Sequence, residues 1–416
     1  MSTALSLSAH DYALKQHYTA EMVENMVYKD NPFLALVAKM EEFGGRNLPI
    51  PVIYGNPQGR SATFARAQAR GQLSSTKGLA FLLTRVKDYS VATMDNETIE
   101  ASKGDANAFL EAATVEIDGA INSLTRSLAV AQYRQGYGEI GQIGSISTTT
   151  ITLLNVEDVT NFEVGQELDV SATISGALRA YGTSGNGLIV TSINRDTGVL
   201  TFGANVTHAD NGIPTAAAND YIFVRGDHTA SSLTKLAGME AWNPYTAPAA
   251  AESFFGVDRS VDVTRLSGLR YDGTADPIEE ALVTAASRAA REGAKIDHFF
   301  MNFKKFGELE KALGAKVQYV NMQANAVVGF RGMIINGPKG PINVVPDQNC
   351  PADRIRGVDL SMWKHCSLGK AVRTIDTDGL QMLRQSSDDG VEVRIGHYGN
   401  LACKAPGSNI NIKVTA

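Results

Sequence analysis

The stretch DANAFLEAATVEIDGAINSLTRSLAVAQYRQG, residues 105–136, decides the architecture of the chain. It predicts a helix, because Asp105 can cap its start, Gly136 can end it, and apolar residues recur between them at spacings of three and four. At about 1.5 Å per residue, this helix would be about 45 Å long and would act as a strut. The apolar positions are Leu110, Ala113, Ile117, Ala120, Ile121, Leu124, Leu128 and Ala131.

Two segments of opposite charge lie around the start of this helix. Between Gly55 and Lys87 there are six cations and no acid, whereas Asp88 to Asp118 contain eight acids against the single cation Lys103. Such segments are suited to pair between copies of one protein, although two solvated faces remain an alternative. The residues predicted to contact a neighbouring copy are Arg60, Arg66, Arg70, Lys77, Arg85, Glu97, Glu100, Asp105 and Glu111.

The basic segment also has the pattern of a long two-stranded loop. Leu48 to Tyr54 and Phe81 to Val86 are predicted strands, with the turn GNPQG at 55–59 and a polar tip near 71–77. An isolated hairpin is marginal in water, so we expect it to lie on another surface. Upstream, residues 1–45 are predicted to form an arm with a helix, which either binds a partner or docks on its own core.

Beyond the helix, the composition changes twice, and together the segments predict an α+β fold. Residues 142–226 are rich in Thr, Val, Gly and Asn, with short alternating runs between 150 and 224, which predicts an all-β module. A mixed pattern follows, with a helix predicted from Asp276-Pro277 to Gly293 and strands continuing to 410–414.

The chain carries no recognisable catalytic, cofactor or metal motif. Its net charge of -6 and pI near 5.7 argue against binding nucleic acid by general electrostatics. Cys350, Cys366 and Cys403 form no CxxC and are predicted to be buried thiols, and His365 beside Cys366 is a poor nucleophile–base pair. GxSxG, the P-loop and any membrane-spanning run are also absent from the sequence. We therefore predict a protein that is not an enzyme and needs no cofactor.

Six segments in the second half of the chain resemble one protein family. They are FFGVDRSVDVTRLSGLRYDG from Phe254, PIEEAL from Pro277, KIDHFFMNFKKFGEL from Lys295, KVQYVN from Lys316, GPKGPINVVPDQNCPADR from Gly337 and GVEVRIGHYGNLACKAPGSNINI from Gly390. These are similar to major capsid proteins of tailed bacteriophages that share the Hong Kong 97 fold.

The resemblance implies a division of the chain into the parts of that fold. These are an N-terminal arm (1–45), an extended loop (46–90), a peripheral-domain strand with the spine helix (91–141), an all-β insertion domain (142–226), a peripheral and axial core (227–300), an axial domain (301–385) and C-terminal strands of the peripheral domain (386–416).

It also implies a structural role. Hexamers and pentamers of the chain would form the icosahedral head of a virion around double-stranded DNA, assembled in the host cytoplasm. The expected partners are further copies, a scaffolding protein, a portal and a decoration protein, with DNA only as non-specific cargo and no membrane contact. Some family members crosslink through a loop lysine, but Lys77 has no recognisable Asn and Glu partners, so crosslinking is not expected here.

Two other classes of function stay open at this point. One is a β-rich binding or adhesion protein that uses the 142–226 module, with Arg225-Gly226-Asp227 at its boundary as the recognition tripeptide. The other is an enzyme of unrecognised type, which a strongly shifted pKa would support.

Overall fold

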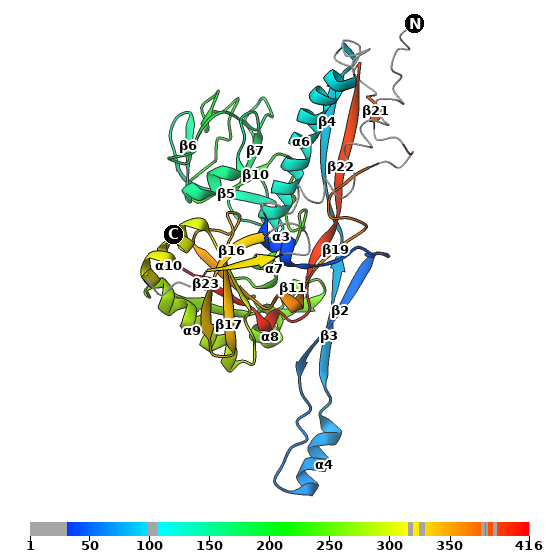
Figure 1. Cartoon of the computed structure of the whole chain (residues 1–416), viewed down its shortest axis with the longest axis vertical. Helices are drawn as coiled ribbons and strands as arrows, with labels where there is room; N and C mark the ends of the chain where they lie inside the picture. The colour runs from blue at the N-terminus through cyan, green and yellow to red at the C-terminus, as the bar shows by residue number, and fades with distance from the viewer. Residues whose placement is uncertain are drawn as a thin grey trace.

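The computed structural model describes residues 31–97, 106–314, 319–323, 329–375, 379, 382–385 and 389–415. Figure 1 shows an elongated molecule in which a long helix and two long strands point to one end and a two-stranded hairpin projects from the other. A β-barrel and a separate sheet with two helices lie beside this axis. The helix predicted in the N-terminal arm lies outside the described residues.

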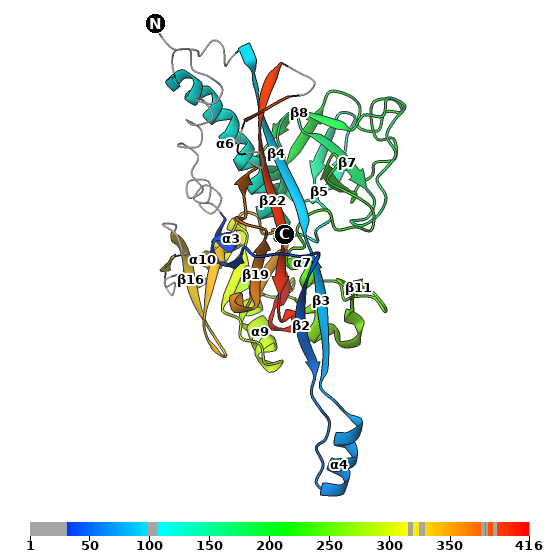
Figure 2. The same cartoon turned by 90° about the vertical axis from the view of Figure 1, so that its right-hand side faces the viewer.

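The predicted strut is present as helix α6 (Ala106–Ala131), which at about 1.5 Å per residue is about 39 Å long. It packs on one face of the strand pair β4 (Val86–Asp95) and β22 (Gly390–Cys403), as Figure 2 shows. β4 alternates buried and exposed side chains, so every second residue faces the helix. From Ile117 to Leu128, the apolar side chains whose spacing predicts the helix are therefore also the ones that pack against β4 and β22.

β22 is the central strand of a six-stranded sheet. Its first part pairs with β4 on one side and with two short strands on the other, and its last part pairs with β19. β1 extends this last part by pairing in parallel with β19, directly after the buried helix α3 (Pro32–Leu36). The shorter strands are β1 (Ala38–Met40), β19 (Trp363–Ser367), β20 (Arg373–Thr374) and β21 (Met382–Arg384).

The predicted hairpin is also present, although its second strand begins before the predicted Phe81 and ends at Thr84, while Val86 starts β4. It consists of β2 (Asn47–Gly55) and β3 (Lys77–Thr84), which pair only with each other within the described residues. Its tip carries a helix, α4 (Phe64–Leu73), which the sequence did not predict. No residue of α4 is buried, so this helix lacks the apolar stripe from which amphipathic helices are recognised.

A closed six-stranded barrel with its own apolar core occupies residues 139–224. The strands predicted between 150 and 224 are confirmed, and an additional first strand starts before the predicted boundary at 142. That the barrel is an insertion into a smaller fold stays a prediction. Its strands are β5 (Glu139–Ile146), β6 (Thr150–Leu153), β7 (Glu167–Ser171), β8 (Leu188–Asn194), β9 (Val199–Phe202) and β10 (Tyr221–Val224).

A seven-stranded sheet with two packed helices forms the remaining large unit. The helices are α9 (Ile278–Arg291), which confirms the predicted helix, and α10 (Phe303–Leu313). The strands, in their order across the sheet, are β13 (Leu269–Asp272), β23 (Ile410–Lys413), β18 (Arg354–Val358), β14 (His298–Met301), β17 (Gly340–Pro346), β16 (Gly329–Gly337) and β15 (Tyr319–Gln323).

Short elements between the barrel and this sheet surround the base of the hairpin. They are α7 (Met239–Trp242), β11 (Ser253–Phe254), β12 (Val257–Asp258) and α8 (Val263–Ser267). Short 3-10 helices occur at Val156–Asn161, Arg259–Asp262, Leu360–Met362 and Pro406–Ser408.

The sheets divide the C-terminal third differently from the predicted segments. β19 to β21 belong to the sheet of β22 and not with the rest of 301–385, and β23 leaves the sheet of β22 for the seven-stranded sheet. The 3-10 turn at Pro406–Ser408 separates β22 from β23. β23 then runs between β13 and β18, where Ile410 and Ile412 are buried. The strands of 386–416 therefore divide between two sheets, and the assignment of this segment to the peripheral domain stays a prediction.

Candidate functional site

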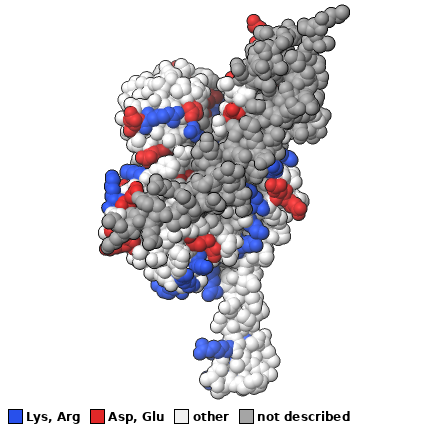
Figure 3. Space-filling view, in the orientation of Figure 1, with Lys and Arg blue, Asp and Glu red and all other residues white. Residues whose placement is uncertain are grey.

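The tip of the hairpin is an exposed cationic part of the described chain. Arg60, Arg66 and Arg70 are all exposed there, and Figure 3 shows Lys and Arg without Asp or Glu on the face of the tip that it draws. Two large apolar side chains accompany them, Phe64 and Leu73, which are 83% and 89% exposed. Because exposed apolar side chains of this size favour burial in an interface, the tip has the composition of a contact surface.

Local contacts close the loop at the tip. The Ser74 hydroxyl accepts a hydrogen bond from the Gln58 amide at 2.8 Å and donates one to the Arg70 carbonyl at 2.9 Å. Gly59 lies so close to Gly71 that a Cβ on Gly59 would be 3.1 Å from the Gly71 Cα. The small residues therefore let the two sides of the tip approach.

Three described acids of the acidic segment lie toward the opposite end of the molecule from the hairpin tip. Asp95 and Glu97 are exposed at the far end of β4, and Glu116 is exposed on the first half of α6. Of the other predicted contact residues, Glu100 and Asp105 lie outside the described residues, as does the side chain of Glu111. Among the described residues, the structure thus does not bring the tip cations Arg60, Arg66 and Arg70 together with Asp95, Glu97 or Glu116 within one subunit.

Two further predicted cations lie nearer the body. Lys77 is exposed at the start of β3. Arg85, beyond the end of β3, donates a hydrogen bond of 2.7 Å from Nη1 to the Phe43 carbonyl and lies over the Phe43 ring. Arg85 therefore has an intramolecular partner at the base of the hairpin.

Aromatic rings hold the hairpin base to the body. Phe81 of β3 is fully buried against Trp242 of α7 and Phe254 of β11, with ring centroids 5.1 and 6.2 Å away. The next residue, Leu82, donates its amide hydrogen to the Phe255 carbonyl at 2.9 Å. Trp242 is in turn fixed by a 2.9 Å hydrogen bond from Nε1 to the Leu401 carbonyl of β22.

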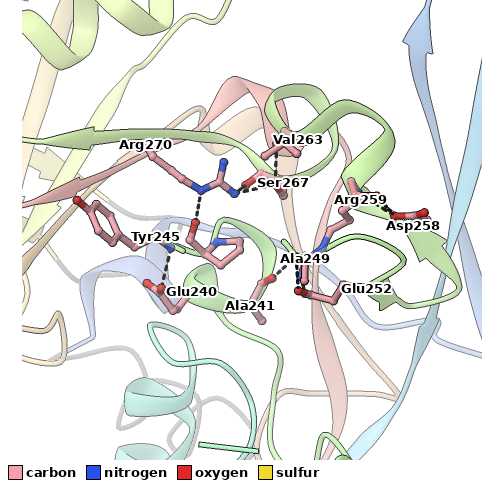
Figure 4. A network of polar contacts seen from close by, with 12 residues as sticks. Glu240, Ala241, Tyr245, Ala249, Glu252, Asp258, Arg259, Val263, Ser267 and Arg270 are labelled. Atoms are coloured by element: carbon pink, nitrogen blue, oxygen red, sulfur yellow. Dashed lines mark hydrogen bonds and ion pairs between the residues drawn. The ribbon is translucent and has the colours of Figure 1, made fainter. Parts of the chain in front are cut away.

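A polar network, drawn in Figure 4, orders the segment that carries these rings. The buried Arg259 donates to the Ala241 carbonyl at 2.6 Å and to Glu252 at 2.7 Å, and its guanidinium lies 4.3 Å from the Phe254 ring centroid. Arg270 donates to the Pro244 carbonyl at 2.7 Å. The network thus ties together the segment that carries Trp242 and Phe254, and no local sequence pattern indicates it because its bonds join residues of separate short elements and loops.

A second polar cluster joins the barrel to the spine helix. Lys235 is 8% exposed, and its Nζ contacts Asp88 of β4 at 2.8 Å, Asp227 after the barrel at 2.9 Å and the Ser127 hydroxyl of α6 at 3.3 Å. Burial would lower the pKa of Lys235, but the two carboxylates outweigh it and raise that pKa. Asp88, Ser127, Asp227 and Lys235 line a cleft of about 720 Å³ between α6, β4 and the barrel.

This cluster bears on the adhesion alternative. Asp227 of the Arg-Gly-Asp tripeptide pairs with Lys235, while Arg225 pairs with Glu167 and lies over the Tyr181 ring. Both charged side chains of the tripeptide therefore have partners within the chain, as expected for a structural turn.

The predicted absence of a nucleophile at His365 and Cys366 agrees with their surroundings. Both are buried, and burial raises the pKa of Cys366 to about 11, which disfavours the reactive thiolate. Burial and the nearby His397 hold the pKa of His365 well below its usual range. Cys350, Cys366 and Cys403 are all free and buried, which confirms that prediction.

Within the described part of the chain, no cluster of three or more His, Cys, Asp or Glu side chains could hold a metal ion. No helix among the same residues is long and apolar enough to span a bilayer.

Comparison with known proteins identifies the chain. The family model described as SU10 major capsid protein matches residues 211–403, which include the hairpin anchor and most of both large sheets. This match supports a structural head-shell protein of a phage, and the matched part of the chain is similar to a major capsid protein. No curated protein sequence matches this capsid protein.

Solved structures that resemble the capsid protein include the cyanophage A-1(L) capsid, at 10% identity and a TM-score of 0.45, covering 92% of each chain. The Gordonia phage Cozz structure has 13% identity and a TM-score of 0.40, covering 93% of this chain and 87% of that one. The capsid of the native GTA particle has 9% identity and a TM-score of 0.42, covering 91% and 89%. The family match, and not these similarities, carries the assignment.

The capsid protein is thus a structural component of a phage head and of the virion, and it self-associates. A shell protein works through the surfaces by which its copies contact one another. Among the described residues, the hairpin tip and the acids at the end of β4 and on α6 are two candidate contact surfaces.

Proposed function

We propose that the chain forms hexamers and pentamers that close into an icosahedral head around double-stranded DNA. In this assembly, Arg60, Arg66, Arg70 and Lys77 of one subunit lie over the acidic segment of the next, which includes Glu97, Glu100, Asp105 and Glu111. Each contact can be weak, because closed symmetry multiplies many small contact free energies into a stable shell.

One observation supports this proposal most. The tip cations and the described acids Asp95, Glu97 and Glu116 lie toward opposite ends of the molecule, which favours pairing of these charges between subunits and not within one. Complementary charges at the two ends of a repeating unit favour head-to-tail association into rings.

The proposal extends to partners and place. Assembly takes place in the host cytoplasm with a scaffolding protein and a portal, and a decoration protein binds the finished head. DNA is non-specific cargo, which agrees with a net charge of -6 and the absence of a strongly basic balance. The chain performs no enzymatic step, and no crosslink forms through Lys77.

The test is charge reversal at the tip. The variant with Arg60→Glu, Arg66→Glu and Arg70→Glu is expected to fold but to yield no closed particles in electron microscopy, because like charges then face each other. The matched control carries Lys at the same three positions and should assemble. Unchanged particle yield from the reversed variant would contradict the proposal.

A further inference from the structure

The register of the hairpin shows which backbone groups of β3 point away from β2. Pro49 stands opposite Leu82, and Pro51 stands opposite Ala80. Proline has no amide hydrogen, so these pairs cannot exchange two hydrogen bonds and are the non-hydrogen-bonded pairs of the ladder. The N–H and C=O groups of Leu82, Ala80 and, by the same alternation, Gly78 therefore point to the outer edge of β3. The bond from the Leu82 amide to the Phe255 carbonyl agrees with this.

The two edges of the hairpin are protected differently. The outer edge of β2 carries prolines at two successive outward-facing positions, Pro49 and Pro51, and proline at such positions blocks the addition of a further strand. The outer edge of β3 carries Gly78 and Ala80, which keep their amide hydrogens. Beyond Leu82, no described strand pairs with this edge. One edge is closed to a third strand, and the other is open.

The open edge lies where the hairpin has no other support. All four residues from Lys77 to Ala80 are exposed, and Figure 1 shows this half of the hairpin projecting beyond the body. Ile53 and Leu82, on the face shared with Ala80, are 68% and 44% exposed. A two-stranded ribbon in water is marginally stable, so a third strand would both satisfy the free amides and cover part of this face.

From this asymmetry we propose that the outer edge of β3 at Gly78 and Ala80 is a strand-addition site for an extended segment of a second copy of the chain. The inference rests on the proposed function, because it names the backbone contact by which the hairpin binds its neighbour. Charge favours a second copy as the occupant, because the charged residues in 55–87 are all cations, whereas the following segment, 88–118, has eight acids and one cation. Main-chain hydrogen bonds would supply affinity, and the flanking charges would choose the partner.

The test uses a proline that removes only an outward-facing amide. Ala80→Pro leaves the ladder with β2 intact, because the Ala80 amide does not take part in it, whereas Ala80→Val keeps the amide and serves as the matched control. We expect Ala80→Val to assemble like the original protein. Ala80→Pro should remain a folded subunit with a particle yield at least about tenfold lower. A particle yield from Ala80→Pro equal to that of the control would overturn the inference.

Residue-resolved hydrogen exchange on the unaltered protein gives a second readout that does not depend on a variant. The amides of Gly78 and Ala80 should exchange quickly in the free subunit and at least about tenfold more slowly in shells. Equal exchange in both states refutes the strand addition while leaving the proposed function intact. If the unaltered protein forms no shells at all with its phage partners, the proposed function and this inference fall together.

Discussion

Phe81 of β3 meets Trp242 of α7 in an edge-to-face arrangement, with ring centroids 5.1 Å apart and ring planes at 73°. Residues 161 positions apart in the sequence thereby join the one segment that projects from the molecule to its main core. Aromatic pairs of this geometry add to the free energy gained by burying the rings. This ring pair is thus one of the contacts that anchor the hairpin near its base.

Truncation of Phe81 should loosen this anchor. Phe81→Ala is expected to lower the free energy of unfolding by about 3–5 kcal/mol, because it leaves a cavity between Trp242 and Phe254. Urea unfolding measures the change. The matched control is Leu79→Ala, two positions along the same strand but 36% exposed, for which we expect less than about 1 kcal/mol. Equal losses from the two variants would show that the ring cluster is not the anchor.

Charge pairing between copies should be rescuable. If the tip cations lie over the acidic segment of a neighbour, then adding Glu97→Arg, Glu100→Arg and Glu111→Arg to the variant with Glu at 60, 66 and 70 should restore particles, because opposite charges again face each other. Each reversed set alone should fail to assemble. Sedimentation of the assembly reactions measures this, and the yield should fall as salt rises in the original protein. Failure of the double set to assemble, with both subunits folded, argues for a different contact.

Loss of Lys235 should loosen the barrel from the spine. Lys235→Met leaves Asp88 and Asp227 without their buried cation, which typically costs about 3–5 kcal/mol. Arg126→Met removes an ion pair to Glu163 across the same cleft, but both partners are largely exposed, so we expect about 0–1 kcal/mol. Thermal unfolding compares the two. A Lys235→Met variant as stable as Arg126→Met would mean that the cluster does not hold the barrel.

The buried His365 should make stability fall in acid. Burial, and after it His397 and Lys39, lower the pKa of His365 in the folded state, whereas in the unfolded chain the pKa is about 6.5. Below that pH the unfolded state binds a proton that the folded state does not, so acidification favours unfolding, and the effect vanishes above pH about 6.5. Its slope reaches about 1.4 kcal/mol per pH unit.

The variant His365→Leu should remove this part of the acid sensitivity. Urea unfolding between pH 5 and 7 measures the slope, and His208→Leu, at an exposed position on the barrel, is the control. A slope that His365→Leu leaves unchanged would place the sensitivity elsewhere, for example at His397, whose ring centroid is 5.1 Å away.

The parts of the fold that the sequence predicts are those with local signals. The spacing of Ile117, Ile121, Leu124 and Leu128 specifies both the helix and its buried face, because one period determines both. The hairpin and the barrel strands were marked by turn residues and alternation in the same way. α4 gave no such signal, since its apolar ends, Phe64 and Leu73, contact no core.

Long-range pairing was not predictable from local patterns. β23 pairs with β13, about 140 residues earlier, and nothing in either short strand names its partner. The same holds for the site: the charge asymmetry between 55–87 and 88–118 was visible in the sequence, but only the fold places the two segments at opposite ends. Arg85 was predicted to contact a neighbouring copy, but in the structure it bonds to Phe43 of its own chain. That contact joins residues 42 positions apart, so no local pattern indicated it.

The position of β23 means that the seven-stranded sheet can be completed only late in synthesis, and assembly must follow that step. Residues 410–413 form an interior strand between β13 and β18. The seven-stranded sheet therefore stays split until the ribosome has translated these residues. A nascent chain can fold its hairpin and barrel early, yet it presents an unfinished sheet until then. Products that lack these four residues would keep β13 apart from β18, so we expect them to be excluded from the lattice.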